Sequence, residues 1–458
     1  MENIFIDRDK ELRLLKSIRN KKHFFLVVSG RRRIGKTTLI LKGFPKAYYI
    51  FVYPNTTIQW LVEETCRLLN VPRFKRFIDL LEYLLDQGIV IIDEFQNFLN
   101  IDRSIYGQIQ RLIDLRKAQN KPVRLVVSGS SYSLLNKVFY DTMAPLYGRR
   151  THEIRLGHLP IKDLFNSITY NIEEFIKAWS IFEGVPYYYE ILDYNKTIEQ
   201  NIINLFLSRD SILIEEGRIV LSSEFSTDAK TYYTILGAIA NGRTKLSEIS
   251  TFFDNKVNVV VKYLEKLRKD FELVRRITPI LEDPRKSKTS FYEINDNFLN
   301  FWFRFVEKNR VFIEQERYEE LVDYFKNNFN NYVGKFFEKF VLRLFKDKII
   351  KIFDFDKIGK QWGSFYDNGK KVYEIDLLAL NESKKELLAV ECKWKENVDP
   401  NKICKALLEK LEYVQWHNNE RKEYLCIFSK SFKEKITEFD GYKVYCIDLN
   451  DIESFLKG

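Results

Sequence analysis

The stretch His23–Phe44, HFFLVVSGRRRIGKTTLILKGF, decides the fold of the N-terminal third of the chain. It begins with an apolar run, residues 24–28, which is typical of a strand buried in a parallel sheet. Residues 30–37 then match the spacing G-x-x-x-x-G-K-T, and a segment with helical character follows. A strand, a glycine-rich loop and a helix in this order predict a phosphate-binding loop (P-loop) in an α/β domain.

The residue types of this loop suit a nucleoside triphosphate. Glycines let backbone N–H groups curl around a phosphate, and the N-terminus of the next helix adds favourable partial charge. We expect Lys36 to reach the β- and γ-phosphates and the Thr37 hydroxyl to ligate the metal, so ATP and Mg²⁺ are the predicted cofactors. The loop residues expected to hold the nucleotide are Gly30, Arg31, Arg32, Arg33, Ile34, Gly35, Lys36, Thr37 and Thr38.

A second apolar run, residues 89–92, ends in Asp93 and Glu94. An acidic pair at the carboxyl end of a parallel strand lies beside the crevice where such sheets bind ligands. We therefore expect Asp93 to hold Mg²⁺ through water and Glu94 to act as the general base on the attacking water. The alternative is an acidic pair that only caps the following helix.

Two further segments leave alternatives open. The third apolar run, VRLVVSGSS, reaches Ser128, which could sense the γ-phosphate or orient water, or could belong to an ordinary serine-rich turn. In PLYGRR, Arg149 or Arg150 could act as an arginine finger in cis or in trans, or the two could form a solvated basic pair. We name Ser128 as a nucleotide-binding candidate and Arg149 as a catalytic candidate.

Six segments, in order along the chain, resemble the archaeal ATPase family of AAA-like signal-transduction P-loop NTPases. They are FIDRDKEL, GRRRIGKTTL, IIDEFQ, VVSGSS, PLYGRR and FEGVPYYYEIL. The resemblance covers roughly residues 1–215. It implies that Arg8 lies near the nucleotide base and that a helical lid follows residue 150. The family's lid motif G-G-x-P is altered here, because Glu183 stands in its first position.

Composition limits the class of protein. The chain has 458 residues and a net charge of +10, which suits about three domains and permits an anionic partner such as DNA. Five cysteines without C-x-x-C spacing and only four histidines disfavour a zinc site and suit a reducing cytoplasm. The charged N-terminus is unlike a signal peptide, and no apolar run approaches the roughly 20 residues of a membrane span.

The middle of the chain predicts a winged helix-turn-helix. Three amphipathic helices are expected between residues 229 and 271, followed by two strands around the charged tip LEDPRKSK. The apolar stripe expected on the third helix comprises Val257, Val260, Val261, Leu264 and Leu267. Lysines lying mostly off this stripe could contact DNA phosphates. The alternative to DNA contact, with equal weight, is that this module only packs inside the ATPase.

The last third contains EIDLLALNESKKELLAVECKW, residues 374–394. Helix, β-meander, helix and strand follow one another here, and this order resembles the PD-(D/E)xK, restriction-endonuclease-like superfamily. If the turn centres on Ser383–Lys384, Asp376 falls opposite Glu391, and Lys393 lies on the same strand face as Glu391. Two facing carboxylates favour a bound Mg²⁺, which Asp376 and Glu391 would ligate.

In this interpretation Lys393 would steady the attacking hydroxide or the charge on phosphorus. The superfamily resemblance implies that Glu338, on the preceding helix, is an additional carboxylate of the site. The sequence departs from the superfamily pattern at Ile375, where a proline would stand. An exposed Glu–Lys pair on a strand is the structural alternative, and a vestigial site that no longer cleaves is the functional one.

These observations predict a cytoplasmic α/β ATPase that acts on DNA, or a nucleotide-dependent switch with a vestigial C-terminal domain. ATP is the expected small-molecule partner and DNA a candidate macromolecular one, no membrane is expected, and a homo-oligomer or protein partner is left open. The expected domains are a P-loop core at 1–150, a helical lid at 151–227, a winged helix at 228–300, linker helices at 301–331 and a nuclease-like domain at 332–458.

Overall fold

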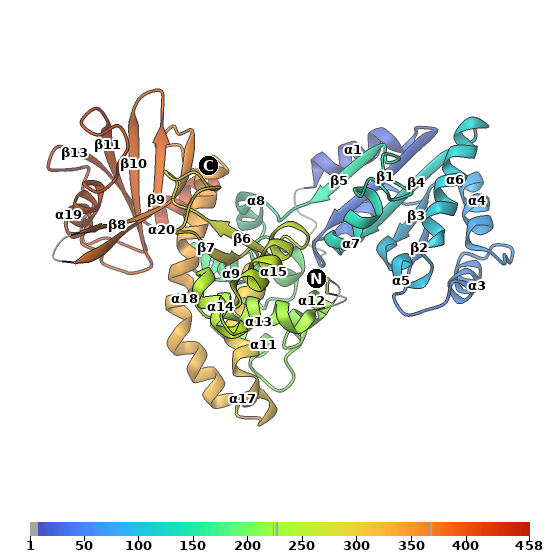
Figure 1. Ribbon diagram of the computed structural model, residues 1–458, viewed down its shortest axis with the longest axis horizontal. Helices are drawn as coiled ribbons and strands as arrows, with labels where there is room; N and C mark the ends of the chain where they lie inside the picture. The colour runs from blue at the N-terminus through green and yellow to red at the C-terminus, as the bar shows by residue number, and fades with distance from the viewer. Residues whose placement is uncertain (1–7, 223, 226–227, 367–368) are drawn as a thin grey trace.

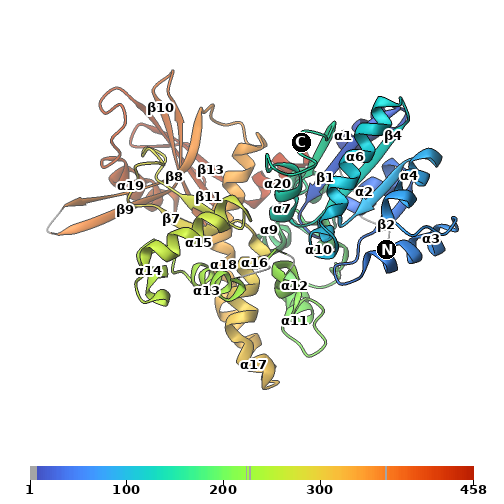
Figure 2. The same cartoon turned by 45° about the vertical axis from the view of Figure 1, so that its right-hand side comes forward.

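A computed structural model describes residues 8–222, 224–225, 228–366 and 369–458 (Figure 1). Two β-sheets lie at opposite ends of the molecule, one built from the N-terminal third and one from the C-terminal third. Helices from the middle of the chain lie between them in both views (Figures 1 and 2). The segments FIDRDKEL and MENIFIDRDKEL begin in residues 1–7, which lie outside the described residues, whereas Arg8 is described.

The N-terminal sheet is parallel throughout, as predicted. Its order is β2 (Tyr48–Phe51), β3 (Val90–Asp93), β4 (Val123–Gly129), β1 (His23–Gly30) and β5 (His152–Leu156). The strands are apolar on both faces because helices cover both sides, and these are α1 (Asp9–Arg19), α2 (Lys36–Gly43), α3 (Ile58–Leu69), α4 (Phe77–Gln87), α5 (Phe98–Ile101), α6 (Ser104–Ala118) and α7 (Tyr132–Phe139).

The edge strand β5 corrects one predicted boundary. It pairs with β1 from Leu26↔His152 to Gly30↔Leu156, so the sheet continues past residue 150, where the core was expected to end. Short helices follow β5. They are α8 (Ile161–Asn166), α9 (Ile172–Phe182), α10 (Pro186–Glu190), α11 (Ile198–Phe206) and α12 (Glu216–Ser222).

The next segment contains three helices and an antiparallel hairpin. These are α13 (Ala229–Ala240), α14 (Leu246–Ser250), α15 (Val257–Lys269), β6 (Val274–Ile277) and β7 (Phe291–Ile294). The apolar stripe of α15 is narrower than predicted. Val260, Leu264 and Leu267 are buried, whereas Val257 and Val261 are 41% and 37% exposed, because only the first three face α13 and the hairpin.

A single helix, α18 (Tyr318–Lys346), connects this unit to the C-terminal sheet. It follows α16 (Asn297–Phe301), a π-helical turn at Trp302–Val306 and α17 (Arg310–Glu314). The domain boundary expected at residue 332 therefore falls inside one continuous helix. Although α18 has 29 residues, charged side chains recur along it, and none of the described helices is long and apolar enough to cross a membrane.

The C-terminal sheet is mixed, in the order β12-β13-β11-β10-β9-β8. Strands β8, β9 and β10 are antiparallel neighbours, whereas β11 is parallel to β10 and β13. The helices α18 and α19 pack on the sheet and contribute to two separate hydrophobic clusters. The bounds are β8 (Lys357–Tyr366), β9 (Lys370–Asn381), β10 (Glu386–Lys393), α19 (Pro400–Leu411), β11 (Lys422–Ser429), β12 (Glu438–Phe439) and β13 (Tyr442–Ile447).

The last helix, α20 (Leu449–Lys457), returns toward the middle of the molecule. It packs against α8 and α9 of the segment that follows the first sheet. The Asn166 side-chain amide donates to the carbonyl of Leu456 at 3.1 Å. The two ends of the described chain are thus joined through the helices after β5.

Candidate functional site

The P-loop connects the end of β1 to the start of α2. Gly35 has φ +90°, a conformation that favours glycine, and a Cβ at Gly30 would lie 2.8 Å from the carbonyl oxygen of Leu156 in β5. The loop curls around its lysine, because Lys36 Nζ donates to the carbonyls of Gly30 at 2.9 Å and Arg31 at 3.0 Å. A cavity of about 270 Å³ opens beside the loop.

Lys36 lies buried in this loop. Burial lowers the pKa of Lys36, and the nearby carboxylates of Glu94 and Asp93 only partly oppose this effect. A buried ammonium group whose hydrogen-bond acceptors are two backbone carbonyls would gain from an anionic partner. The lysine is therefore placed to exchange its carbonyl partners for phosphate oxygens.

Asp93 is the most densely hydrogen-bonded carboxylate of the site. Its Oδ2 accepts hydrogen bonds from Thr37 Oγ1 and from Tyr49 Oη, each at 2.8 Å. Its Oδ1 accepts from the Ser128 hydroxyl and from the Glu94 backbone N–H. The oxygens of Thr37 and Asp93 converge, so this pair fits a role in holding Mg²⁺.

The same contacts place Ser128 differently from the expectation. Ser128 is buried and bonded to Asp93, and the cavity is lined instead by Ser130, two residues later. Ser130 donates to Glu94 Oε2 at 2.8 Å, and the Gln96 amide donates to the same oxygen. Among the polar residues at the end of VVSGSS, the sequence analysis singled out Ser128 instead of Ser130, and it assigned no role to Gln96 of IIDEFQ.

Most of the predicted nucleotide residues do meet at this cavity. Arg8 donates to the carbonyl of Gly157 at 2.9 Å and lines the cavity with Tyr187 of α10. The predicted residues that line it are Arg8, Arg32, Arg33, Ile34, Gly35, Lys36, Thr37, Thr38 and Glu94. Gly30 and Arg31 instead line a second cavity, of about 390 Å³, which borders the loop as well.

Two loop arginines are tied to later parts of the chain. Arg31 pairs with Asp296, which caps α16, at 2.8 Å. Arg33 donates to Glu216 of α12 at 2.7 Å, and its guanidinium lies 3.7 Å from the ring centroid of Tyr187. Glu216 is only 1% exposed, so this ion pair is buried on its acidic side. The conformation of the P-loop is thereby coupled to the lid and to α16.

Glu183 explains the altered lid motif. Its backbone has φ +47° and ψ −126°, a conformation that favours glycine, which the family motif has at this position. The side chain is 6% exposed and lies 2.6 Å from Lys339 Nζ of α18. Burial would raise the pKa of Glu183, but Lys339 and His158 beside it lower the value to about 2. Glu183 thus adopts a backbone conformation that is less strained for glycine, but its side chain forms a buried ion pair with Lys339.

Arg149 is not brought to the P-loop within this chain. It donates to Asp114 at 3.0 Å and does not line the nucleotide cavity. Arg150 donates to Glu153 at 3.0 Å. A role for Arg149 in cis is therefore not supported by its position, and a role in trans stays a prediction.

The C-terminal candidates meet around β9 and β10. The register between β9 and β10 ends at the pair Leu377 and Val390, one position before the predicted pair Asp376 and Glu391. Asp376 Oδ2 accepts from the Cys392 backbone N–H at 2.8 Å. Burial first, and then the negative charges of Glu338 and Glu391, raise the pKa of Asp376 to about 7. Three of the predicted side chains thus influence one another.

The predicted metal site at these residues is not formed. Lys393 lies 2.6 Å from Glu391 Oε1, and Lys410 of α19 lies 2.9 Å from Oε2, so two lysines neutralise this carboxylate. Glu338 is paired with Lys360 of β8. Across the described ranges, no three His, Cys, Asp or Glu side chains are arranged around a common metal position. The second site therefore does not fit Mg²⁺ in this arrangement.

Comparison with known proteins defines the class of the N-terminal part. Residues 22–164, which hold the P-loop, Asp93 and Glu94, match the AAA domain family. The chain is similar to the Walker-type ATPase paby2304 of Pyrococcus abyssi at 18% identity, with 65% of this chain and 95% of that chain covered and a TM-score of 0.44. It is similar to Cdc6p from Pyrobaculum aerophilum at 17% identity, with 66% and 94% covered and a TM-score of 0.31.

The chain therefore contains an AAA-type P-loop domain. It is 32% identical over 454 residues to the uncharacterized protein MJECL04 of Methanocaldococcus jannaschii, covering 94% of this chain and 97% of that protein. The chain belongs to the same protein family as MJECL04. Residues 302–405 match a family described as archaea bacterial proteins of unknown function.

Proposed function

We propose that this protein binds Mg-ATP at the P-loop and hydrolyses its terminal phosphoanhydride bond. The observation that carries this proposal is the contact between Thr37 Oγ1 and Asp93 Oδ2, beside a Glu94 carboxylate that faces the same cavity. A metal-holding pair and a general base on neighbouring positions are what phosphoryl transfer to water requires. The match to the AAA domain family supports the same class of chemistry.

Each residue has a distinct task in this reaction. Lys36 leaves the carbonyls of Gly30 and Arg31 and binds the β- and γ-phosphate oxygens. Mg²⁺, when bound through Thr37 and Asp93, neutralises charge that develops on those oxygens. Glu94 accepts a proton as water attacks the γ-phosphorus, the bond to the β-phosphate oxygen breaks, and ADP leaves. Ser130 and Gln96 hold the Glu94 carboxylate toward the cavity.

The test is the release of phosphate from ATP with and without Mg²⁺. We expect Mg²⁺-dependent turnover in the wild-type protein and none in Lys36→Ala. Arg149→Ala is measured beside it, because Arg149 lies away from the cavity within one chain and its role in trans is still a prediction. Turnover that survives Lys36→Ala would contradict the proposal, and loss of turnover in Arg149→Ala would assign that arginine a role in trans.

A second candidate function is a nucleotide-dependent switch with slow turnover. The observation that favours it is the pair of contacts Arg31–Asp296 and Arg33–Glu216, which tie the P-loop to later segments. Such a protein would retain ADP or ATP tightly, and the lid would report the nucleotide state. Nucleotide that stays bound through gel filtration, with turnover unchanged by DNA, would favour this candidate over an ATPase that acts on DNA.

For residues 228–458 we infer a winged helix followed by a PD-(D/E)xK-like domain that contacts DNA. Three helices with an antiparallel hairpin support the first, and the closeness of Asp376 to Glu338 and Glu391 supports the second. Because Lys393 and Lys410 occupy Glu391, the arrangement favours a vestigial site. We expect no cleavage of linear, branched or single-stranded DNA with Mg²⁺ or Mn²⁺. Cleavage by the wild type that disappears in both Asp376→Ala and Lys393→Ala would contradict this inference.

A further inference from the structure

One face of α18 carries a row of charged side chains. Lys335, Glu338, Lys339, Leu342, Arg343 and Lys346 follow one another at intervals of three, one, three, one and three residues, which places them on the same side of the helix. The row extends over the C-terminal half of α18, from the level of the β6–β7 hairpin to the end of the helix. Five of its six members are charged, and four of those are cations.

Three hollows lie in succession along this row and share its residues. The first, of about 40 Å³, is lined by Lys335, Glu338 and Lys339. The second, of about 280 Å³, begins at Lys339 and ends at Lys346. Arg275 of β6 lines both of these hollows. The two hollows are therefore neighbours along α18, and residues 158–184 line the second one together with the hairpin.

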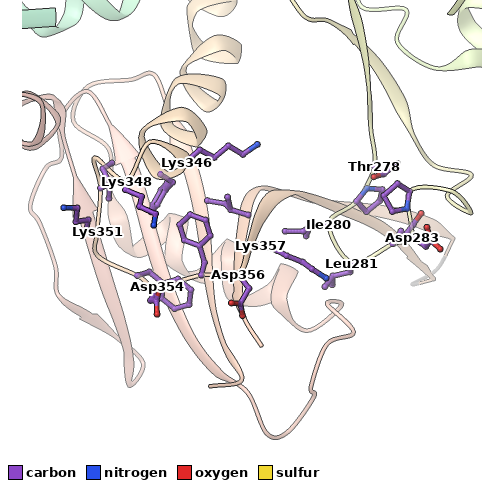
Figure 3. A pocket seen from close by; sticks show the side chains of 18 residues that line it. Thr278, Ile280, Leu281, Asp283, Lys346, Lys348, Lys351, Asp354, Asp356 and Lys357 are labelled. Atoms are coloured by element: carbon purple, nitrogen blue, oxygen red, sulfur yellow. The ribbon is translucent and has the colours of Figure 1, made fainter. Parts of the chain in front are cut away.

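The third hollow, of about 1010 Å³, begins where the second ends, at Lys346. Figure 3 shows Lys346 above this hollow, with Ile280 and Leu281 across from it. The segment opposite is held in place because the Ile280 backbone N–H donates to the Lys360 carbonyl of β8 at 2.9 Å. The hollow at the C-terminal end of α18 is thus the largest of the three.

Positive charge collects at the second hollow. Arg275, Arg343 and Lys346 reach it from two different elements, and the one carboxylate in its lining, Glu183, is already paired with Lys339. Burial first, and then the charges of Arg275 and Arg343, lower the pKa of Lys346. Cations that only served solubility would point apart into solvent, whereas these converge on one hollow.

The carboxylates nearest to these cations do not fill the hollow. Arg275 pairs with Glu293 at 2.9 Å and Arg343 pairs with Asp347 at 2.7 Å, but neither acidic residue lines the second hollow. Within the ranges that the structure describes, Lys346 has no ion-pair partner. An anion in the hollow would therefore meet a net positive lining.

We propose that Arg275, Arg343 and Lys346 bind the phosphodiester backbone of a nucleic-acid strand that lies along α18, on the side of the helix that carries Glu338. The proposal rests on the DNA action proposed above and assigns it a surface. The row from residue 335 to residue 346 is roughly 16 Å long at 1.5 Å per residue. A B-DNA strand carries one charge per ~3.4 Å, so several phosphates fit along it.

The competing surface is α15, the third helix of the winged-helix unit. Two lysines at its ends are already paired, because Lys256 lies 3.5 Å from Asp254 and Lys269 lies 3.0 Å from Glu265. Exposed valines, including Val257, interrupt the rest of this face. The face of α18 differs because three of its neighbouring cations, Arg275, Arg343 and Lys346, line one hollow.

The experiment measures binding of a fluorescently labelled single-stranded oligodeoxynucleotide by anisotropy, over a series of salt concentrations, with full-length protein. We expect Arg343→Gln/Lys346→Gln to weaken binding at least ~10-fold. The slope of log affinity against log salt should fall by about 1.4, about 0.7 for each single-strand phosphate that the protein no longer neutralises. The matched control, Lys262→Gln/Lys266→Gln on α15, should change affinity less than about twofold. Arg343→Lys/Lys346→Arg keeps both charges and should retain binding. This variant distinguishes an effect of lost charge from an effect of disturbed folding.

The outcomes distinguish this inference from the proposed function. The proposed surface on α18 would be contradicted if the wild type and Arg343→Gln/Lys346→Gln bound with equal affinity, or if the α15 control lost more affinity. Either result would leave the proposed action on DNA intact. Loss of binding in the charge-keeping variant would also overturn the proposed surface, because the effect would then come from disturbed structure. If the wild-type protein binds no oligodeoxynucleotide at low salt, the proposed action on DNA is itself contradicted. The ATPase measurement is independent of all these results.

Discussion

At the scale of single residues, the molecule fixes its carboxylates by surrounding each with specific donors. Asp93 accepts four hydrogen bonds, Glu94 is held by Ser130 and Gln96, and Glu183 is held by Lys339. Asp376 differs, because its neighbours include two further carboxylates. Because these environments are opposite, the contributions of Glu183 and Asp376 to the stability of the fold depend on pH in opposite directions.

Lys339→Met should destabilise the protein by roughly 3 kcal/mol, because it leaves the buried Glu183 carboxylate without its partner. The folded-state pKa of Glu183 is lowered to about 2, so its contribution to stability is present above its ordinary pKa of 4.5 and is lost as the pH falls toward 2. Urea unfolding of the wild type and variant between pH 3 and pH 7 measures this. A difference that stays constant over that interval would contradict the assignment.

Asp376→Asn should stabilise the protein at pH 8 and have little effect at pH 4. The pKa of Asp376 is raised to about 7, so the folded state disfavours the charged form, and stability is lost as the pH rises from its ordinary pKa of 3.8 through 7. The neutral amide avoids that loss and can still accept from Cys392. Thermal unfolding at the two pH values is the measurement, and stabilisation that is larger at pH 4 would refute the raised pKa.

At the scale of elements, the sequence predicted the features that depend on residues close together in the chain. The apolar runs on either side of Ser383–Lys384 specify the β9–β10 register, and the P-loop spacing specifies β1 and α2. Contacts between distant segments could not be obtained this way. Three such contacts depend on tertiary packing, and no motif spacing in the sequence indicates them. They are Arg31 with Asp296, Lys410 with Glu391, and α20 with α8.

Gly334→Ala, in the middle of α18, should raise the free energy of unfolding by about 0.5–1 kcal/mol. The new Cβ would lie 3.5 Å from the Trp394 Cβ, which is an ordinary contact, and alanine restricts the unfolded chain. Gly217→Ala in α12 is the contrasting variant. Its Cβ would lie 2.1 Å from the Trp302 ring and should destabilise the fold by about 1–3 kcal/mol. Denaturant unfolding of both variants tests this, and equal effects would contradict the packing described.

At the scale of the whole molecule, a chain of polar contacts connects the P-loop to α18. Arg31 pairs with Asp296, the Asn297 side-chain oxygen accepts from Lys339, and Lys339 pairs with Glu183. Glu183 precedes the turn that leads to α10 at the nucleotide cavity. Polar contacts therefore link the P-loop to the C-terminal half of the molecule.

Arg33→Ala should accelerate the release of bound ADP, because it frees Tyr187 and the lid from the loop. Glu216→Gln should have a similar effect, and the double variant should add little, since both changes remove one interaction. Stopped-flow displacement of a fluorescent ADP analogue measures the rates. Additive effects of the two changes would show that Arg33 and Glu216 act separately.

The most direct test of the proposed ATPase is Glu94→Gln, followed through a single turnover of bound ATP. The amide keeps the shape of the side chain but cannot accept a proton from the attacking water. Hydrolysis at the P-loop predicts a rate about 10²–10⁴-fold below that of the wild type, with the affinity for ATP unchanged. An unchanged rate of hydrolysis in Glu94→Gln would contradict the proposed mechanism.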